Sequence, residues 1–160
     1  MIGWIARLLG GAEPGLADAR TADAAAIATL HAASFRRGWD EAEIEGLLID
    51  PAVLAQKAQV AGRVVGFILS RRAADEAEIL SVAVDARRQG RGLGRRLLTA
   101  HLGALAGYGT RTVFLEVDGA NASARRLYAR AGFVEVGRRP GYYPQPGGAA
   151  SSALVLRRDL

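Results

Sequence analysis

Three glycines, Gly90, Gly92 and Gly94, alternate with larger residues between a β-like run and an apolar helical stripe. Glycine has no Cβ, so an anion can approach the backbone N–H groups of such a loop closely. The first turn of the following helix adds N–H groups without intrahelical partners and a partial positive charge. Arginines surround the loop at positions 87, 88, 91, 95 and 96. These features predict a binding site for a phosphate or pyrophosphate group.

The glycine spacing argues against two common nucleotide-binding loops. The nucleoside-triphosphate pattern G-x-x-x-x-G-K-[ST] is absent, and the third glycine comes one residue too early for the dinucleotide pattern G-x-G-x-x-G. A dinucleotide fold would also place its loop after the first strand, whereas this loop lies past the middle of the chain. Glu116 nevertheless ends the next strand, where such a fold would hold a ribose, so dinucleotide binding stays an alternative hypothesis.

Two further side chains could carry acid–base chemistry. Glu116 lies in the otherwise apolar run Thr112 to Val117, where a carboxylate is costly unless it has a chemical task or a hydrogen-bonding partner. Tyr128 follows on a helix expected to begin at Asn121 or Ser123, and its phenol could donate a proton. The residues alone leave a structural role open for both, hydrogen bonding for the carboxylate and aromatic packing for the phenol.

The composition excludes several classes of site. The 160 residues contain no cysteine and only two histidines, His31 and His101, so disulfides, thiolate nucleophiles and cysteine- or histidine-rich metal sites are not expected. His101 falls on an apolar helical stripe and is interpreted as a packing residue. Arginine supplies almost all the cations behind the net charge of +5. Such a charge would suit nucleic acid as a partner, but a small phosphorylated ligand explains a local arginine cluster without it.

Short β-like runs alternate with helical ones, which predicts a single α/β domain over residues 14–160. The expected strands, with a tight turn at Gly62-Arg63, are 16–20, 53–61, 63–71, 76–84, 112–117, 133–137 and 153–156. Helices are expected over 24–35 with a cap at Thr21 or Asp23, over 40–48, over 93–105, and after Asn121.

Residues 1–13 are expected to form an N-terminal extension. Its aliphatic residues fall on one side of a helix, at Ile2, Ile5, Leu8 and Leu9. This pattern predicts a short amphipathic helix that packs on the domain or on a second copy, with membrane-surface contact as the alternative. A signal peptide is not expected, because the apolar stretch is short and broken by Arg7. No apolar run approaches the roughly 18 residues of a membrane span. The absence of cysteine suits a reducing cytoplasm, where we expect the protein.

The glycine loop and the segment after it resemble a known family. Gln89-Gly90-Arg91-Gly92-Leu93-Gly94 is similar to the acetyl-coenzyme A motif Q/R-x-x-G-x-G/A of the GNAT superfamily of N-acetyltransferases. The continuation LEVDGANASARRLYARAGFVEVGRR, from Leu115 to Arg139, is similar to the downstream segment of that superfamily over its whole length. Agreement is dense from about Glu78 to Pro144. This segment resembles the bacterial RimI type, whose members acetylate the N-terminal alanine of a small-subunit ribosomal protein.

The resemblance implies a GNAT fold, a mixed, curved sheet of six to seven strands flanked by about four helices, with a splay at a β-bulge where the cofactor binds. Acetyl-coenzyme A would be the co-substrate, with no metal. Val82, Ala83 and Val84 would line the splay and bind the pantetheine arm. The pyrophosphate would be held by Gln89, Gly90, Arg91, Gly92, Leu93, Gly94 and Arg95. Asn121 would also contact the cofactor, a role compatible with capping its helix.

The same resemblance implies direct acetyl transfer to an amine, with Glu116 as the base and Tyr128 as the acid. Tyr142 and Tyr143, in a loop rich in glycine and proline, would bind the acceptor. An α-amine has a pKa near 7.7–8.0 and is roughly 10% neutral at pH 7, against roughly 0.04% for lysine. The expected acceptor is therefore a protein N-terminus, with the alanine of a ribosomal protein as the first candidate and no direct nucleic-acid binding required.

Several alternatives stay open for the acceptor. Serines replace the acidic residues expected before the last strand for a basic ribosomal N-terminus, although Glu41, Glu43 and Glu45 could compensate. An enzyme of the same fold that acts on lysine or a small amine is the main alternative. A non-catalytic domain that senses coenzyme A or binds nucleic acid is another. The two tyrosines could also simply anchor their loop, and the oligomeric state is not specified by the sequence.

Overall fold

The computed structural model describes residues 11–160, and the helix expected in the N-terminal extension lies outside the described residues. Helices and short 3-10 turns (η) occur in the order η1 (Thr21–Asp23), α2 (Ala24–Ser34), α3 (Glu41–Ile49), η2 (Ala86–Arg88), α4 (Leu93–Gly107) and α5 (Ala122–Arg130). The strands are β1 (Gly15–Asp18), β2 (Val53–Val60), β3 (Arg63–Ala73), β4 (Glu76–Val84), β5 (Thr112–Asp118), β6 (Val134–Tyr143) and β7 (Ser151–Asp159). Within the described residues, every helix is too short or too polar to cross a membrane.

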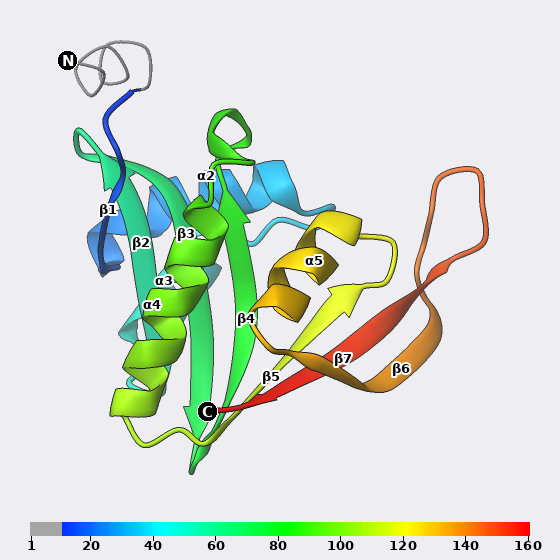
Figure 1. Cartoon of the computed structure of the whole chain (residues 1–160). Helices are drawn as coiled ribbons and strands as arrows, with labels where there is room; N and C mark the ends of the chain where they lie inside the picture. The colour runs from blue at the N-terminus through cyan, green and yellow to red at the C-terminus, as the bar shows by residue number, and fades with distance from the viewer. Residues whose placement is uncertain (1–10) are drawn as a thin grey trace, which may run out of the picture.

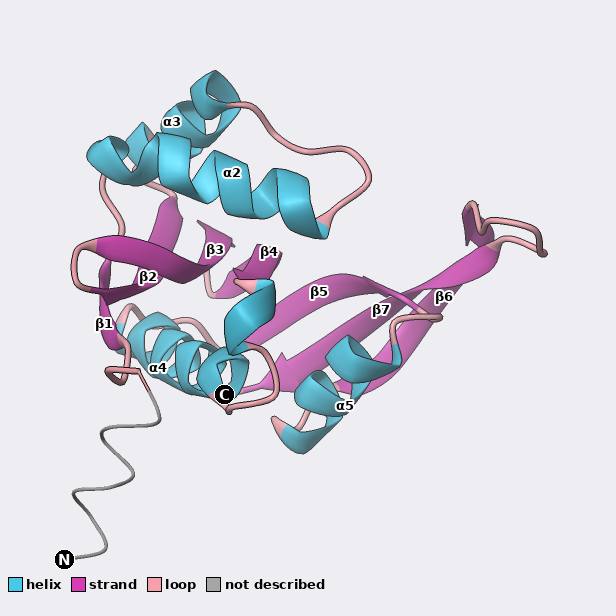
Figure 2. Ribbon diagram, turned by 90° about the horizontal axis from the view of Figure 1, so that it is seen from above, coloured by secondary structure: helices cyan, strands magenta, loops and turns pink. Residues whose placement is uncertain are grey.

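Over residues 11–160, seven strands form one mixed sheet in the order β1-β2-β3-β4-β5-β7-β6 (Figure 1). Each neighbouring pair is antiparallel except β4 and β5, which run parallel. Seen from above, α2 and α3 cover one face, α4 and α5 cover the other, and β5, β7 and β6 bend away from the remaining strands (Figure 2). This arrangement confirms the mixed, curved sheet with helices on both faces.

The parallel pair β4–β5 holds together over only part of its length. Backbone pairing ends at Ile79 opposite Leu115, although both strands continue for several residues. β4 carries an extra residue at Leu80, where its register against β3 shifts. Such a bulge bends the strand and increases its twist. The two strands therefore separate directly before Glu116 on β5, which is the splay expected from the sequence.

Two apolar clusters fix the helices on the sheet and decide which way the site residues point. On one face α4 and α5 pack against Leu115 and Val117 of β5, and on the other α2 and α3 pack against Phe67 of β3. Side chains alternate between the faces along a strand. Glu116 therefore points to the face of α2 and α3, whereas Tyr128 belongs to the apolar cluster of the opposite face.

Two local expectations are wrong. The β2–β3 hairpin turns at Ala61-Gly62, one residue earlier than expected, because both of these residues take positive φ. Asp23, one of the two expected caps, makes no capping bond to α2. Its carboxylate instead accepts the Arg20 N–H at 2.8 Å and pairs with Lys57 at 2.8 Å, so it ties η1 to β2.

β6 is longer than expected and includes the two tyrosines that the sequence placed in a loop. It runs to Tyr143, which pairs with Ser151 of β7. The sequence indicated an earlier end because Pro140 and Gly141 interrupt the strand pattern. Proline lacks an N–H and Gly141 takes a positive φ of 66°, and both are absorbed where the register shifts between Arg139 and Tyr143.

His101 is a buried packing residue, as expected. Its Nδ1 lies 3.0 Å from Gln56 Oε1 and its Nε2 lies 2.7 Å from Ser70 Oγ. Burial lowers the pKa of this imidazole to about 4, so the ring is neutral at pH 7. A neutral ring with both nitrogens hydrogen-bonded joins α4 to β2 and β3 behind the splay.

Candidate active site

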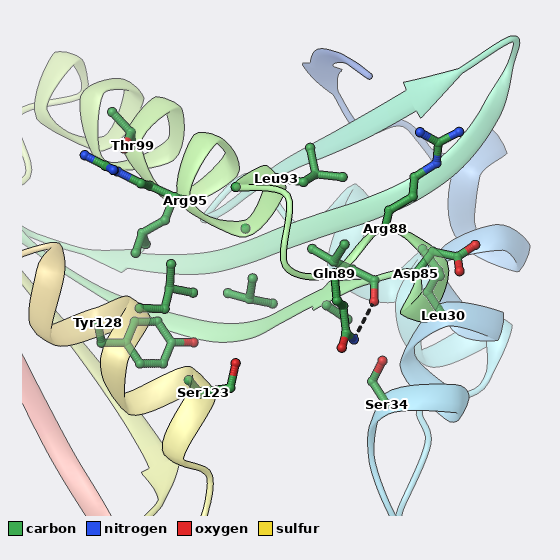
Figure 3. A pocket seen from close by; sticks show the side chains of 18 of the residues that line it. Leu30, Ser34, Asp85, Arg88, Gln89, Leu93, Arg95, Thr99, Ser123 and Tyr128 are labelled. Carbon is green, nitrogen blue, oxygen red and sulfur yellow. Dashed lines mark hydrogen bonds between the residues drawn. The ribbon is translucent and has the colours of Figure 1, made fainter. Parts of the chain in front are cut away.

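A cleft of about 1960 Å³ opens between α2, β4, α4 and α5 (Figure 3). It is larger than the roughly 300–1,000 Å³ of a site for a drug-sized ligand. Most residues predicted to bind the cofactor line it, namely Val82, Ala83, Val84, Gln89, Gly90, Gly92, Leu93, Gly94, Arg95 and Asn121, and so does Tyr128. Arg91 is exposed and does not line the cleft.

The glycine loop turns its backbone toward this cleft through two left-handed residues. Gly90 and Gly92 have φ values of 74° and 80°, which non-glycine residues rarely adopt. Apart from the adjoining residues of the chain, no heavy atom lies within 4 Å of the position that a Cβ would take on either residue. Gly92 is also the N-cap of α4 and supplies no side-chain acceptor to the first turn. The N–H groups of that turn are thus available to an anion.

The arginines around the loop divide into two groups. Arg88 donates to the Ala12 carbonyl at 3.5 Å, and Arg96 donates to the Pro14 carbonyl at 3.0 Å. These two side chains hold the segment before β1 against the loop, a structural role that the sequence did not indicate. Arg87 and Arg95 line the cleft, and so does Arg88, whereas Arg91 and Arg96 do not. Fewer arginines than the five expected are therefore available to an anion.

Two polar side chains of the cleft also stabilise its walls. Gln89 Nε2 donates to the Val84 carbonyl at 3.1 Å and fastens the loop to the end of β4 (Figure 3). Asn121 Oδ1 accepts the Ala124 N–H at 3.1 Å, so it caps α5 as expected. Because Asn121 also lines the cleft, capping and cofactor contact remain compatible for this residue.

Tyr128 extends from α5 into the cleft, and its ring is buried (Figure 3). The ring packs edge-on against Phe133, with 5.8 Å between the centroids. Burial raises the pKa of the Tyr128 phenol to about 12. The hydroxyl therefore keeps its proton at neutral pH, which is the state that a proton donor needs.

Glu116 lies at the splay but on the opposite face of the sheet from the cleft. Its side chain is 29% exposed, and its Oε1 lies 2.9 Å from Arg139 Nη2. It is not among the residues that line the cleft. The predicted base and the predicted acid, Tyr128, thus reach the separation of β4 and β5 from opposite sides.

The two tyrosines of β6 lie beside Glu116. Tyr142 and Tyr143 pack edge-on with 5.0 Å between centroids, and the Arg139 guanidinium lies 5.4 Å from the centre of the Tyr142 ring. Burial, followed by the negative charge of Glu116, raises the pKa of Tyr143. The structure therefore brings the predicted base and both predicted acceptor-binding tyrosines close together.

Asp118 fastens the β6–β7 connection to the end of β5. Its carboxylate accepts hydrogen bonds from the Ser151 hydroxyl, from Gln145 Nε2 at 3.1 Å and from the Ala120 N–H at 2.9 Å. Burial disfavours the charge on this carboxyl, but the three hydrogen bonds, with a contribution from the positive charge of Arg36, outweigh burial and lower its pKa. A charged Asp118 therefore positions the segment that follows the tyrosines.

Asp118 and Arg139 were not predicted as site residues. Asp118 could have been found, because it follows Glu116 by two residues on a strand and so shares its face. Arg139 gives no such signal, since it lies on β6. Only the strand order β5-β7-β6 brings its guanidinium to Glu116.

This geometry coincides with a match to a protein family. The profile described as "Acetyltransferase (GNAT) family" matches residues 24–133, which is more than half of the chain. The chain belongs to the GNAT acetyltransferase family. The matched range contains the glycine loop, the splay between β4 and β5, and the helix of Tyr128, so the family region coincides with the cleft.

Individual GNAT proteins give the same picture. The ribosomal protein bS18-alanine N-acetyltransferase of Haemophilus ducreyi is 34% identical over 93 residues, 58% of this chain and 64% of that protein. The chain thus matches less than two thirds of that relative's length. The ribosomal-protein-S18-alanine N-acetyltransferase of Escherichia coli superposes with a TM-score of 0.84 at 28% identity, over 91% of this chain and 93% of that chain. The yncA protein of Salmonella typhimurium, solved with its cofactor acetyl-CoA, shares the fold at 21% identity and a TM-score of 0.81, over 93% and 95% of the two chains.

Proposed function

We propose that this protein transfers the acetyl group of acetyl-coenzyme A to the α-amine of a protein N-terminus. The observation that carries the proposal is the splay of β4 and β5, which has a phosphate-compatible cleft on one face and the carboxylate of Glu116 on the other. Similarity to the bS18-alanine and S18-alanine N-acetyltransferases supports this acceptor class, and the N-terminal alanine of a ribosomal protein is the first candidate.

The residues of the cleft fit acetyl-coenzyme A. Gly90 and Gly92 leave open space in front of the N-terminus of α4, where a pyrophosphate would accept backbone N–H groups. Arg95 adds a cation at the same wall. Beyond Ile79, β4 no longer pairs with β5, so its residues Val82 to Val84 can offer backbone groups to the amide-bearing pantetheine arm.

The side chains at the splay can supply the proton transfers that the reaction needs. Bound acetyl-coenzyme A supplies a thioester whose carbonyl carbon accepts the amine nitrogen as its C–S bond breaks. Glu116 accepts the proton that the amine loses. Tyr128, which is protonated at neutral pH, hydrogen-bonds the departing sulfur and gives it a proton. The products are an N-acetylated N-terminus and coenzyme A, with no bond to the protein.

The test uses two peptides of the same length that differ at one internal position and in whether the N-terminus is blocked. The first begins with a free alanine and contains no lysine, and the second is blocked at its N-terminus and carries one lysine. Coenzyme A release is followed with a thiol reagent, and mass spectrometry locates the acetyl group. Turnover of the free N-terminus alone is the expected result. Turnover through lysine alone, or none with either peptide while coenzyme A binds, would contradict an α-amine acceptor.

A further inference from the structure

Residues 35–40 connect α2 to α3 on the face of the sheet that carries Glu116 (Figure 2). Phe35, at the start of this connection, lines the cofactor cleft. Arg36 lies near enough to Asp118 for its charge to act on that carboxylate. The connection therefore borders the end of β5 on one side, and the two tyrosines of β6 border it on the other. An acceptor that brings its α-amine to Glu116 has this connection as one wall of its path.

His31 fixes the far end of the connection from within α2. Its Nδ1 accepts the Trp39 N–H at 3.0 Å. The next N–H, that of Asp40, donates to Glu43 Oε2 at 2.9 Å, and the Asp40 carboxylate accepts the Glu43 N–H in return. Two successive backbone N–H groups are thus bound by side chains, one from each of the helices that the connection joins.

Aromatic packing holds the His31 imidazole against the connection. The residue is 4% exposed, and its ring stacks on the Trp39 ring with 4.4 Å between centroids. The Phe35 ring centre lies 4.5 Å away, and that of Phe67 on β3 lies 6.3 Å away. The imidazole therefore joins both ends of the connection to the sheet.

The hydrogen bond to Trp39 requires a neutral imidazole. Nδ1 can accept an N–H only while it carries no proton, whereas both ring nitrogens of an imidazolium are donors. Burial lowers the pKa of His31, although the negative charge of Glu43, in the first turn of α3, acts in the opposite direction. The aromatic side chains against the ring, from the connection and from β3, carry no charge. The ring is thus neutral at pH 7 and accepts the Trp39 N–H.

We propose that His31 is a positioning residue for the acceptor: its neutral imidazole fixes residues 35–40 as a wall of the acceptor site, and its protonation releases that wall. This inference rests on the proposed function and adds a pH dependence that does not come from the amine. An imidazolium would set its own N–H against that of Trp39, so the acceptor KM would rise. kcat would not change, because the connection supplies none of the groups that transfer protons.

The experiment uses the lysine-free peptide with a free N-terminal alanine, between pH 5 and pH 8. It compares the unaltered protein with His31→Phe and His31→Asn. Phenylalanine keeps the aromatic packing but offers no acceptor to Trp39, whereas asparagine offers an oxygen that accepts the N–H and does not titrate. kcat and the acceptor KM are determined separately at saturating acetyl-coenzyme A, and urea unfolding checks that each variant is folded.

The acceptor KM of the unaltered protein divided by that of His31→Asn isolates the imidazole, because titration of the amine affects both proteins equally. We expect this ratio to lie within about twofold of one above pH 7 and to rise below pH 6.5, at equal kcat. At pH 8, His31→Phe should raise the acceptor KM roughly tenfold, as for a buried N–H that loses its partner. The rise in acid should approach the same factor, since protonation removes the same hydrogen bond.

Two further variants separate the imidazole from the connection. Gly38→Ala should raise the acceptor KM at every pH, because a Cβ at Gly38 would lie 2.9 Å from Ala32 Cα and displace the connection while His31 stays intact. His101→Asn removes the other buried imidazole, which bonds to side chains of β2 and β3 instead, and should follow the pH profile of the unaltered protein.

An acceptor KM that is unaltered in both His31→Phe and Gly38→Ala would overturn the inference. A KM ratio that stays constant down to pH 5, or an effect confined to kcat, would overturn it as well. Each of these outcomes leaves the α-amine acceptor standing. If His31→Phe does not fold, His31→Asn and Gly38→Ala still decide. Absence of turnover with the peptide, despite coenzyme A binding, would overturn the proposed function and this inference together.

Discussion

The two sides of the splay bind their ligands with different groups, backbone on the cofactor side and side chains on the acceptor side. On the cofactor side the binding surface is mainly backbone, shaped by Gly90, Gly92 and the start of α4 within one short run of sequence. On the acceptor side it consists of side chains from β5 and β6, including Glu116 and Arg139, which only the sheet brings together. A surface made by local backbone geometry tolerates change in its neighbours, whereas one made by matched side chains depends on every partner.

This difference predicts that substitutions can impair acceptor turnover and coenzyme A binding separately. A substitution on the acceptor side should change turnover or the acceptor KM and leave coenzyme A affinity unaltered. A substitution in the glycine loop should do the reverse. Turnover and coenzyme A affinity should be measured for every variant, because a substitution that changes both would contradict the separation.

The largest effect is expected from Glu116→Gln. The amide keeps the size of the side chain but cannot accept the amine proton, so kcat should fall by roughly 10²- to 10⁴-fold. Coenzyme A affinity, measured by calorimetry, should be unaltered because Glu116 does not line the cleft. Glu135→Gln, on β6 and paired with Arg138, is the control and should keep full activity. Unaltered kcat in Glu116→Gln would remove this residue from the proton transfer.

Tyr128→Phe tests the residue where the two sides meet. Loss of the hydroxyl should lower kcat by roughly 10²-fold with little change in the KM of either substrate, since the ring and its contact with Phe133 are kept. Steady-state kinetics with both substrates varied would show this. A raised acetyl-coenzyme A KM at normal kcat would make the phenol a binding group instead of an acid.

Tyr128→Phe should also change how the stability of the protein depends on pH. Burial raises the pKa of Tyr128 from 10.0 to about 12, so the folded state favours the neutral phenol. The resulting contribution to the free energy of unfolding is complete below pH 10 and is lost as the pH rises toward 12. It amounts to at most about 3 kcal/mol. Urea unfolding between pH 8 and pH 11 should therefore show a steeper loss for the unaltered protein than for Tyr128→Phe.

The cofactor side, which is mainly backbone, could be predicted from the sequence, whereas most of the acceptor side could not. Gly90-Arg91-Gly92 predicts an anion-binding turn because glycine and a helix start specify that geometry locally. Glu116 could be singled out as a charge within an apolar strand. Its partner Arg139 could not, because contact across β5, β7 and β6 depends on strand order and on the register shift after Arg139. The predicted end of β6 came too early, because Pro140 and Gly141 are typical of a loop when the pairing with β7 is unknown.

A smaller effect is expected in the glycine loop, from Gly92→Ala. Gly92 has a φ of 80°, and an alanine there costs roughly 1–2 kcal/mol or forces the loop to move. The acetyl-coenzyme A KM should rise roughly threefold to tenfold, with the acceptor KM unaltered. Gly103→Ala is the matched control, because Gly103 is exposed within α4 with nothing within 4 Å of its Cβ position. That alanine should raise stability by about 0.5–1 kcal/mol and leave both KM values unaltered.

The smallest effect, and the sharpest test of separability, comes from Asp118→Asn. Asparagine keeps one carbonyl oxygen but places an NH₂ group against the donors of Gln145 and Ser151, so the β6–β7 connection should loosen. The acceptor KM should rise roughly threefold, in line with the loss of a charge-assisted hydrogen bond near the surface, and coenzyme A affinity should be unaltered. Because the pKa of Asp118 is lowered in the folded protein, its contribution to stability is present above its ordinary value near 3.8 and is lost as the pH falls through the lowered value. Asp118→Asn should therefore not show this loss of stability when unfolding is followed below pH 4. A change in its coenzyme A affinity would show that the acceptor side also shapes the cleft.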